Sequence, residues 1–339
     1  MPKSPSSPLP IVALSGLEDG QEADVFVLLA EKEPHKTRDG KPYFKVMFRD
    51  ARREVRFPIW SDLPIFEDCR DNWEVGRFYK LRALYRISSF GPQLDIRRIR
   101  LAVEADRQDG FDPNECRISS VFPPEAMYEE ILAVAAKEIG KGKLLNLVTR
   151  IFKDNRKALL ETAAARWNHH AFHGGLLEHT LSVTKIVVLL CDHYETTYPK
   201  KKGLLSRPLA VAGAILHDIG KIREMRCDEV GAYHTTEGSL IGHIVLGRDF
   251  VRDYGKTVEL EPDMRTHLEH IVLSHQRFAD WGAPKPPMSI EAILVHHADS
   301  VDALLGVHEN IGKADAGGGE ISSRKNLLGY PILVQRPGS

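Results

Sequence analysis

Between Val25 and about Val103 the chain alternates short apolar and β-branched runs with turn residues, a pattern typical of β-strands. The pair Asp39-Gly40 favours a hairpin between the first two runs. Five candidate strands follow one another without a helical stretch long enough for a crossover, which predicts a small antiparallel barrel such as an OB-fold. An SH3-like barrel fits the same pattern. The five runs are VFVLLAEKE, PYFKVMFRD, REVRFPIW, RFYKLRALYRI and QLDIRRIRLAV.

From Pro123 onwards the apolar positions recur with a helical period. The segment PPEAMYEEILAVAAKEIG opens with proline and early glutamate and closes at Gly140, which marks a helix start and a helix end. Further helical stretches are expected at 143–166, 176–197, 207–218, 237–254, 262–275 and 288–306. This half of the chain is therefore predicted to be all-α.

These patterns predict a multidomain α+β protein, with an N-terminal small β-barrel (OB-fold) followed by an all-α domain. The expected parts are a Pro- and Ser-rich flexible arm at 1–14, the barrel at 15–104, a linker at 105–122, the helical domain at 123–315 and a C-terminal tail at 316–339. A length of 339 residues agrees with two domains.

Composition excludes several classes of protein. With 42% hydrophobic and 27% charged residues the chain is too apolar for wholesale disorder. No apolar run reaches the roughly 20 residues that span a bilayer, and the N-terminus lacks the apolar core of a secretory signal. We therefore expect a cytoplasmic protein without a membrane partner. The net charge is −1, but Arg77 to Arg100 holds seven basic residues against one acidic residue, Asp95.

Candidate chemistry is concentrated in the helical half. The strongest motif is His217-Asp218-Ile219-Gly220-Lys221, which ends the apolar run LAVAGAIL and offers an imidazole and a carboxylate to one site. An isolated His-Asp pair is weak evidence. Here it lies within an ordered series of polar residues, which begins at His179 in HHAFHGGLLEHTLSV and continues through His243, His275 and Asp299.

This order of His, His-Asp, His, His and Asp resembles the HD superfamily of metal-dependent phosphohydrolases. The resemblance implies that His179, His217, Asp218 and Asp299 bind one metal ion, and that Asp218, His243 and His275 bind a second.

Mixed imidazole and carboxylate ligands suit Mn²⁺, Fe²⁺, Co²⁺, Ni²⁺ or Zn²⁺, and a carboxylate that bridges two ions can help to activate water. The lack of cysteine near these residues argues against a structural zinc site. Asp218 and Lys221 are the predicted catalytic residues, since Lys221 could place an ammonium group on a substrate phosphate.

The segment HHAFH contains three more histidines. His169 and His173 have the i, i+4 spacing of a helical metal pair, but six ligands already complete a two-ion set. We therefore expect His169 and His170 to contact substrate, and a purely structural role is the alternative.

A closer resemblance rests on HHAFHGGLLEHTLSV, HDIGK and WGAPKPPMSIEAILVHHADSVDA after a small β domain. These stretches look like the bacterial YhaM-like 3′-to-5′ exoribonucleases. That family implies an OB-fold joined to an HD domain, removal of nucleotides from single-stranded RNA and possible action on single-stranded DNA. It also implies two divalent ions, manganese first and Mg²⁺ among the alternatives. A homo-oligomer around a substrate channel would fit such a family.

The exonuclease interpretation assigns a role to the barrel. Phe44, Tyr79 and Tyr85 are expected to stack on bases, while Arg82 and Arg86 neutralise phosphates. The alternative for the aromatic residues is barrel core, because they occupy alternating strand positions. Two other functions stay open, namely an HD phosphohydrolase or phosphodiesterase for a small or cyclic nucleotide and a non-catalytic nucleic-acid-binding protein.

Overall fold

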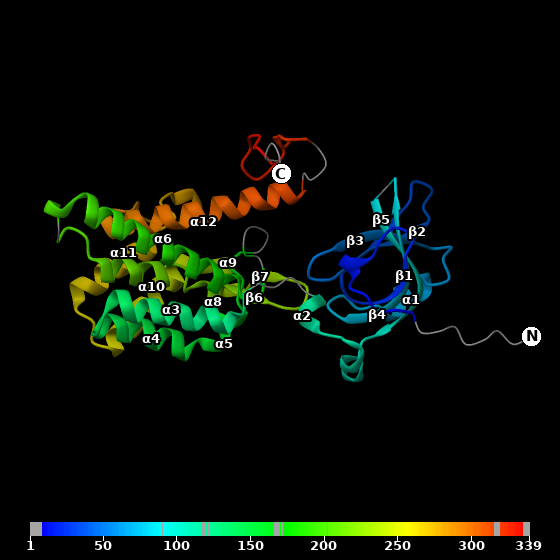
Figure 1. Ribbon diagram of the computed structural model, residues 1–339, viewed down its shortest axis with the longest axis horizontal. Helices are drawn as coiled ribbons and strands as arrows, with labels where there is room; N and C mark the ends of the chain where they lie inside the picture. Colours follow the sequence, from blue (N-terminus) through cyan, green and yellow to red (C-terminus); the bar gives the residue numbers. More distant parts are fainter. Residues whose placement is uncertain are drawn as a thin grey trace, which may run out of the picture. The chain divides into compact units, whose positions relative to one another are not determined.

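The computed structural model divides into two compact units (Figure 1). One unit is Met1–Ser119 together with Asp228–Gly231, and the other is Ser120–Cys227 together with Ala232–Ser339. The structure describes residues 9–89, 91–116, 120, 122–165, 170, 172–201, 203–314 and 319–334. His169, one of the predicted substrate contacts, lies outside these ranges.

The first unit is built on a five-stranded antiparallel sheet. Its strands are β1 (Glu22–Lys36), β2 (Pro42–Arg49), β3 (Glu54–Trp60), β4 (Phe78–Ser88) and β5 (Gly91–Leu101), in the order β3-β2-β1-β4-β5. The two outer strands, β3 and β5, also contact each other, so the sheet curls into a barrel. A short helix, α1 (Phe66–Asn72), joins β3 to β4. This strand order is that of an OB-fold, as predicted, and it decides against the SH3-like alternative.

The expected linker after the barrel contains ordered structure in its described part. A 3-10 helix, η2 (Glu104–Asp109), and a short helix, α2 (Pro113–Cys116), follow β5. Phe111 and Cys116 pack against Phe26 and Leu28 of β1, outside the main barrel core. Two further 3-10 helices are η1 (Leu14–Gly16), before the barrel, and η3 (Pro199–Lys201), in the helical unit.

The second unit is helical, as predicted, with one small β-hairpin that the sequence did not indicate. The hairpin pairs β6 (Met225–Cys227) with β7 (Ala232–His234). The helices are α3 (Pro124–Ile139), α4 (Lys143–Asp154), α5 (Arg156–Glu161), α6 (Gly175–Thr197), α7 (Arg207–Leu216), α8 (Lys221–Glu224), α9 (Thr236–Ile241), α10 (His243–Thr257), α11 (Pro262–Ser274) and α12 (Ile290–Ala314), with η4 (Ala279–Trp281) before α12.

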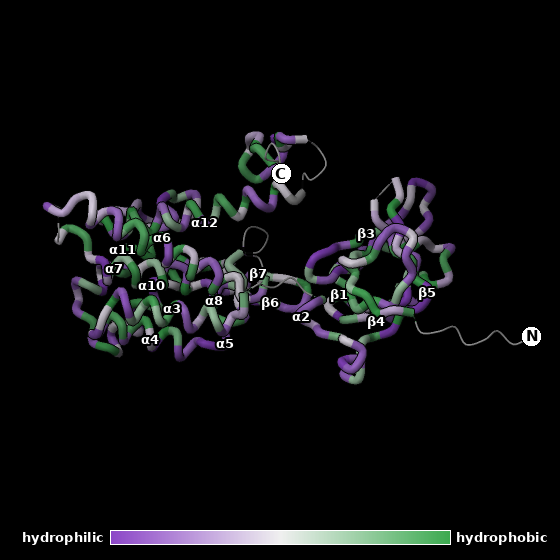
Figure 2. Tube along the Cα trace, in the orientation of Figure 1, coloured by the Kyte–Doolittle hydropathy of each residue, from purple (hydrophilic) through white to green (hydrophobic). Residues whose placement is uncertain are grey.

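Helix α7 lies at the centre of this unit. All residues from Leu209 to Leu216 are buried, and α3, α4, α6, α11 and α12 contact the helix. Gly213 allows α11 to approach, because a Cβ there would lie 2.7 Å from a methyl carbon of Ile271. Figure 2 shows the apolar residues distributed through this bundle. The burial of α7 carries the residues that follow it, His217 and Asp218, into the interior.

Two predicted helices are broken in the structure. The stretch 143–166 divides at Asn155 into α4 and α5, and 237–254 divides at Gly242 into α9 and α10. Gly242 has φ +79°, a left-handed conformation that glycine adopts without strain. The second break places His243 on the first turn of α10.

The tail after α12 returns to that helix. Ile332 packs with Val307 and Ile311, and Ile321 forms an isolated bridge with Leu333. Among the described residues, no helix is both long and apolar enough to cross a membrane.

Candidate metal centre

The six predicted metal ligands come together in the helical unit. His179 lies on α6, His217 and Asp218 directly follow α7, His243 begins α10, His275 follows α11 and Asp299 lies on α12. Their ligand atoms form two groups in which all atoms lie within 4.8 Å of one another. One group is His179, His217 and Asp299, and the other is Asp218, His243 and His275.

Asp218 lies between the two groups and directs one carboxylate oxygen to each. Its Oδ2 atom is 3.4 Å from His179 Nε2 and 3.5 Å from His217 Nε2. Its Oδ1 atom is 3.4 Å from His243 Nε2 and 3.6 Å from His275 Nε2. A carboxylate with this geometry can bridge two metal ions.

The imidazole rings are oriented with their Nε2 atoms towards the centre. The Nδ1 atoms of His217 and His275 donate to the carbonyl oxygens of Ala214, at 2.7 Å, and Val272, at 2.8 Å. Because a carbonyl oxygen only accepts, these rings carry the proton on Nδ1, and in the neutral form their Nε2 lone pairs are free to bind a metal.

Carboxylates orient the other two rings. Asp302 Oδ2 lies 2.6 Å from His179 Nδ1, and Glu224 Oε1 lies 3.0 Å from His243 Nδ1. Such hydrogen bonds to the second ring nitrogen are a regular feature of metal-binding histidines. Sequence reasoning missed Asp302 and Glu224, and the Asp299-Ser300-Val301-Asp302 spacing was the available signal for the first.

The donor set fits divalent cations. Within the described part of the chain, Asp218 Oδ1, His243 Nε2 and His275 Nε2 are buried and have no hydrogen-bond partner. Buried polar atoms without partners are costly, and a cation among these three atoms would satisfy all of them. Imidazole nitrogens and carboxylate oxygens are ligands for Mn²⁺, Fe²⁺, Co²⁺, Ni²⁺ and Zn²⁺.

Opposite charges dominate the electrostatics of the site. Burial opposes the charge on Asp218, but Lys221, His217 and His179 outweigh it and hold the pKa of Asp218 well below its usual value. Burial likewise opposes a charge on His179, yet hydrogen bonds to Asp218, Asp299 and Asp302 raise the pKa of that imidazole. Burial also opposes the charge on Asp299, but a hydrogen bond with His179 and the nearby His217 lower the pKa of Asp299. The carboxylates are thus ionised and ready to bind a cation.

Lys221 reaches the same centre from α8. Its Nζ atom is 2.6 Å from Asp218 Oδ2, and this contact raises the pKa of Lys221 against the effect of burial. The structure therefore places an ammonium group beside the candidate metal centre.

The predicted substrate contact His170 lies beside the first metal group. Its Nε2 atom is 3.2 Å from Asp302 Oδ2 and its Nδ1 atom is 3.5 Å from Glu178 Oε1. His170 has φ +55°, an uncommon conformation for a residue other than glycine. These contacts tie His170 to the carboxylate that orients His179.

The predicted stacking residues of the barrel do not form a binding face. Tyr79 and Tyr85 are 2% and 6% exposed and belong to the barrel core, because both share the inward-facing side of β4 with Leu81 and Ala83. Rings buried in this way cannot stack on a base, so the prediction is wrong for both. Phe44 packs partly buried against the same core.

The two predicted phosphate-binding arginines have partners in the barrel. Arg82 forms a two-bond ion pair with Asp24, at 2.7 and 2.9 Å, and Arg86 lies 3.1 Å from Asp95 with an exposed side chain. Both residues belong to the first unit, whereas the candidate metal ligands belong to the second.

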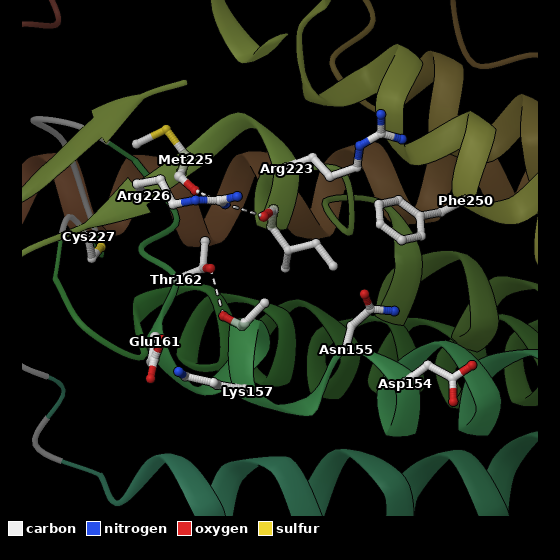
Figure 3. A pocket seen from close by; sticks show the side chains of 12 residues that line it. Asp154, Asn155, Lys157, Glu161, Thr162, Arg223, Met225, Arg226, Cys227 and Phe250 are labelled. Atoms are coloured by element: carbon white, nitrogen blue, oxygen red, sulfur yellow. Dashed lines mark hydrogen bonds between the residues drawn. The ribbon is translucent and has the colours of Figure 1, made fainter. Parts of the chain in front are cut away.

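A separate cavity of about 460 Å³ adjoins α8 (Figure 3). Asn155 and Phe250 line it together with Ile222, Arg223 and Arg226, and Arg226 Nη1 donates to the Ile222 carbonyl at 2.9 Å. None of the six candidate metal ligands lines this cavity. The cavity is therefore distinct from the candidate metal centre.

Comparison with known proteins agrees with the geometry. The model of the HD domain family matches residues 176–304, which include all six candidate ligands. A "3'-5' exoribonuclease YhaM" from Oceanobacillus iheyensis is 31% identical over 290 residues, covering 84% of this chain and 85% of the relative. A protein of the same name from Listeria monocytogenes serotype 4b is 28% identical over 298 residues, covering 88% of this chain and 90% of the relative. Another from Listeria innocua is 28% identical over 294 residues, covering 87% of this chain and 89% of the relative.

The fold and the site define a metal-dependent phosphohydrolase of the HD superfamily. Within that superfamily the chain belongs to the YhaM family of 3′-to-5′ exoribonucleases. Among solved structures, the second OB-fold domain of replication protein A from Methanococcus maripaludis matches with a TM-score of 0.21 and 13% identity, over 28% of this chain and 99% of that one. The OB-fold assignment rests on the strand order described above.

Proposed function

We propose that this protein removes nucleotides from the 3′ end of single-stranded RNA by hydrolysing phosphodiester bonds, with nucleoside 5′-monophosphates as products. Single-stranded DNA is a second substrate of the same chemical class. The observation that carries the proposal is the position of Asp218, whose two carboxylate oxygens face two separate groups of ligands.

In this proposal His179, His217, Asp218 and Asp299 hold one ion, and Asp218, His243 and His275 hold the other. Manganese is the proposed metal, since the ligands combine imidazole and carboxylate groups. Divalent ions bound there would supply the Lewis acidity that activates water and neutralises the scissile phosphodiester.

The residues of the chain have defined parts in this chemistry. The hydrogen bonds at Nδ1 fix the ring orientations of His179, His217, His243 and His275 before substrate arrives. Lys221 holds its ammonium group at the centre, where it can offset the negative charge that develops on phosphate oxygens. Asp218 would be the ligand shared by both ions, since its two carboxylate oxygens face the two ligand groups.

The test is a digestion of single-stranded RNA labelled at its 5′ end, in Mn²⁺ or EDTA, with products resolved by length. Wild-type protein in Mn²⁺ should produce a ladder that shortens from the 3′ end, and EDTA should abolish it. Asp218→Asn should lower the rate by at least about a thousandfold, because it removes the bridging charge. The matched control, Asp280→Asn, changes an exposed aspartate of η4 and should retain full activity.

Two results would contradict the proposal. Undiminished cleavage by purified Asp218→Asn would show that the centre is not catalytic. If RNA stayed intact under every condition while free or cyclic nucleotides were hydrolysed, the substrate of the centre would be a small nucleotide and not RNA.

A further inference from the structure

The cavity beside α8 has the size and the lining of a small-molecule site. Its volume of about 460 Å³ lies within the range of roughly 300–1,000 Å³ that such sites occupy. Residues at the junction of α4 and α5, on α8 and β6, and on α10 line the cavity (Figure 3). The proposed hydrolysis uses none of these residues.

Helix α8 borders both the cavity and the candidate metal centre. Ile222 and Arg223 line the cavity. Lys221 and Glu224, at the two ends of the helix, contact two of the candidate metal ligands instead. A ligand in the cavity would therefore occupy a different place from a phosphodiester at the metal centre, although it would touch the same short helix.

One end of the cavity offers an aromatic ring and a fixed hydrogen-bond acceptor. Phe250 and Asn155 lie at this end (Figure 3). The amide nitrogen of Asn155 donates to the carbonyl oxygen of Ile151 at 2.8 Å and lies 3.3 Å from the Tyr254 hydroxyl. Because a carbonyl oxygen only accepts, the amide has one orientation, and its Oδ1 atom is left for a donor in the cavity. This end fits a flat ring that carries an N–H group.

The other end of the cavity carries cations. Lys157 and Arg226 are both exposed, and the Lys157 side chain has no ion pair or hydrogen bond within the described part of the chain. Arg226 is anchored through Nη1, which donates to the carbonyl oxygens of Ile222 and Met225 at 2.9 and 3.1 Å. The anchoring fixes the guanidinium group and leaves its remaining N–H groups for an anion.

The other charged groups of the lining change this balance little. Asp154 accepts from Arg150 at 2.7 Å, and Arg223 forms an ion pair with Glu237. Glu161 is exposed and can accept hydrogen bonds from sugar hydroxyls, as acidic residues do in dinucleotide sites. One acidic group therefore faces two cations, which favours an anionic ligand.

A nucleotide combines the groups that these two ends match. A base packs on an aromatic side chain and carries N–H donors at its edge, while its phosphate binds lysine and arginine. A free phosphate would leave the ring and the amide oxygen unused, and an apolar ligand would leave both cations unused.

We infer that this cavity binds one mononucleotide, with the base against Phe250 and Asn155 and the phosphate against Lys157 and Arg226. The inference rests on the proposed function only in that such a nucleotide is also the proposed product. A free mononucleotide and the terminal nucleotide of an RNA chain share this chemistry.

The test measures binding of adenosine monophosphate (AMP) to the full-length protein by calorimetric titration. EDTA is present, so that no metal ion can hold the phosphate. Lys157→Gln should weaken the affinity at least about 10-fold, because a hydrogen bond between charged groups is lost. Phe250→Leu should weaken it about 5-fold or more, because the base loses its aromatic partner. Phe250→Tyr keeps a ring and should retain most of the affinity.

Two residues outside the cavity provide matched controls. Lys153→Gln removes an exposed cation from α4, four residues before Lys157, and Phe122→Leu removes an exposed ring. Both should leave AMP affinity unchanged. The unfolding temperature of every variant separates loss of binding from loss of folding, and the exposed position of Lys157 keeps that variant informative if Phe250→Leu unfolds.

Competing ligands identify what the cavity accepts. Adenosine and inorganic phosphate should each compete at least about 10-fold more weakly than AMP, since each lacks one of the two matched groups. Inorganic phosphate that competes as well as AMP would overturn the inference. An oligoadenylate that displaces AMP would identify the end of an RNA chain as the ligand, and AMP that stays bound would identify the free mononucleotide; either result supports a nucleotide site.

The outcomes also separate this inference from the proposed hydrolysis. No AMP binding, or equal affinity in wild type, Lys157→Gln and Phe250→Leu, would overturn the inference and leave the exonuclease untouched. AMP binding that depends on both residues, in a protein that digests no RNA, would support the cavity and contradict the exonuclease.

Discussion

At the scale of single residues, the candidate centre depends on which nitrogen of each histidine carries the proton. Backbone carbonyls fix this for His217 and His275, whereas His179 depends on a carboxylate, Asp302, at 2.6 Å. Burial opposes the charge on Asp302, but its hydrogen bonds with His170 and His179 lower its pKa. Asp302 is therefore a charged positioning residue for a metal ligand.

We predict that Asp302→Asn weakens Mn²⁺ binding about 10-fold and Asp302→Ala about 100-fold, because the ring of His179 loses its charged partner and then its hydrogen bond. Calorimetric titration of metal-free protein with Mn²⁺ measures this directly. Asp280→Asn serves as the control. Equal affinities in all four proteins would show that Asp302 has no part in orienting His179.

The order of histidines and aspartates along the chain predicted which six residues meet through its resemblance to the HD superfamily. Asp302 was missed although its spacing from Asp299 was a signal, and Glu224 could not be predicted, because its contact with His243 crosses between helices and depends on packing. For the barrel aromatic residues, the sequence indicated the strand but not the side that faces inwards. The period of β4 places Tyr79 and Tyr85 on one face, and only the closed barrel shows that this face is the inner one.

At the scale of secondary structure elements, α8 is the segment on which the site depends most directly. Lys221 and Glu224, at its two ends, contact Asp218 and His243. Gly220 allows this short helix to pack on α10, because a Cβ there would lie 2.0 Å from the His243 carbonyl oxygen and 2.5 Å from the Gly247 nitrogen. Both atoms belong to the backbone and cannot turn aside.

We predict that Gly220→Ala lowers the free energy of unfolding by about 3 kcal/mol and reduces Mn²⁺ affinity, because α8 and α10 must separate to make room. Urea unfolding and metal titration measure the two effects. The control is Gly312→Ala on α12, where the nearest atom to an added Cβ lies 4.0 Å away. That substitution should be neutral or stabilise the helix by up to about 1 kcal/mol. A neutral Gly220→Ala would contradict the close packing.

Helical periodicity predicted most elements but not the breaks between them. Residues 237–254 have one continuous pattern, yet the chain turns at Gly242 and the His243 backbone nitrogen donates to Glu224 at 2.9 Å. The interaction that stabilises this break lies 19 residues away in sequence. Local pattern cannot reveal it.

At the scale of the whole molecule, bound metal should stabilise the helical unit. Mn²⁺ at a hundred times its dissociation constant adds about 2.7 kcal/mol per site. We predict a rise in the unfolding temperature of about 5–10 °C per site, followed by helical circular dichroism.

For each variant, the measurement to compare is the difference between its unfolding temperature in Mn²⁺ and its unfolding temperature in EDTA. His275→Ala should lose about half of the wild-type difference, since it affects one of two ligand groups, and Asp218→Asn should lose most of it. Asp280→Asn should keep it all. A wild-type unfolding temperature that does not respond to any divalent cation would contradict a metal centre.

Because the ligands lie far apart in sequence, a bound ion would restrain opening of the helical bundle. His179 and Asp299 belong to one ligand group although 120 residues separate them in sequence, and His179 and His217 are 38 residues apart. An ion held by such distant residues acts as a removable cross-link that closes several long loops at once. Loss of the ion frees these loops together, so local openings of the bundle should be more frequent in EDTA than in Mn²⁺, as hydrogen exchange would measure.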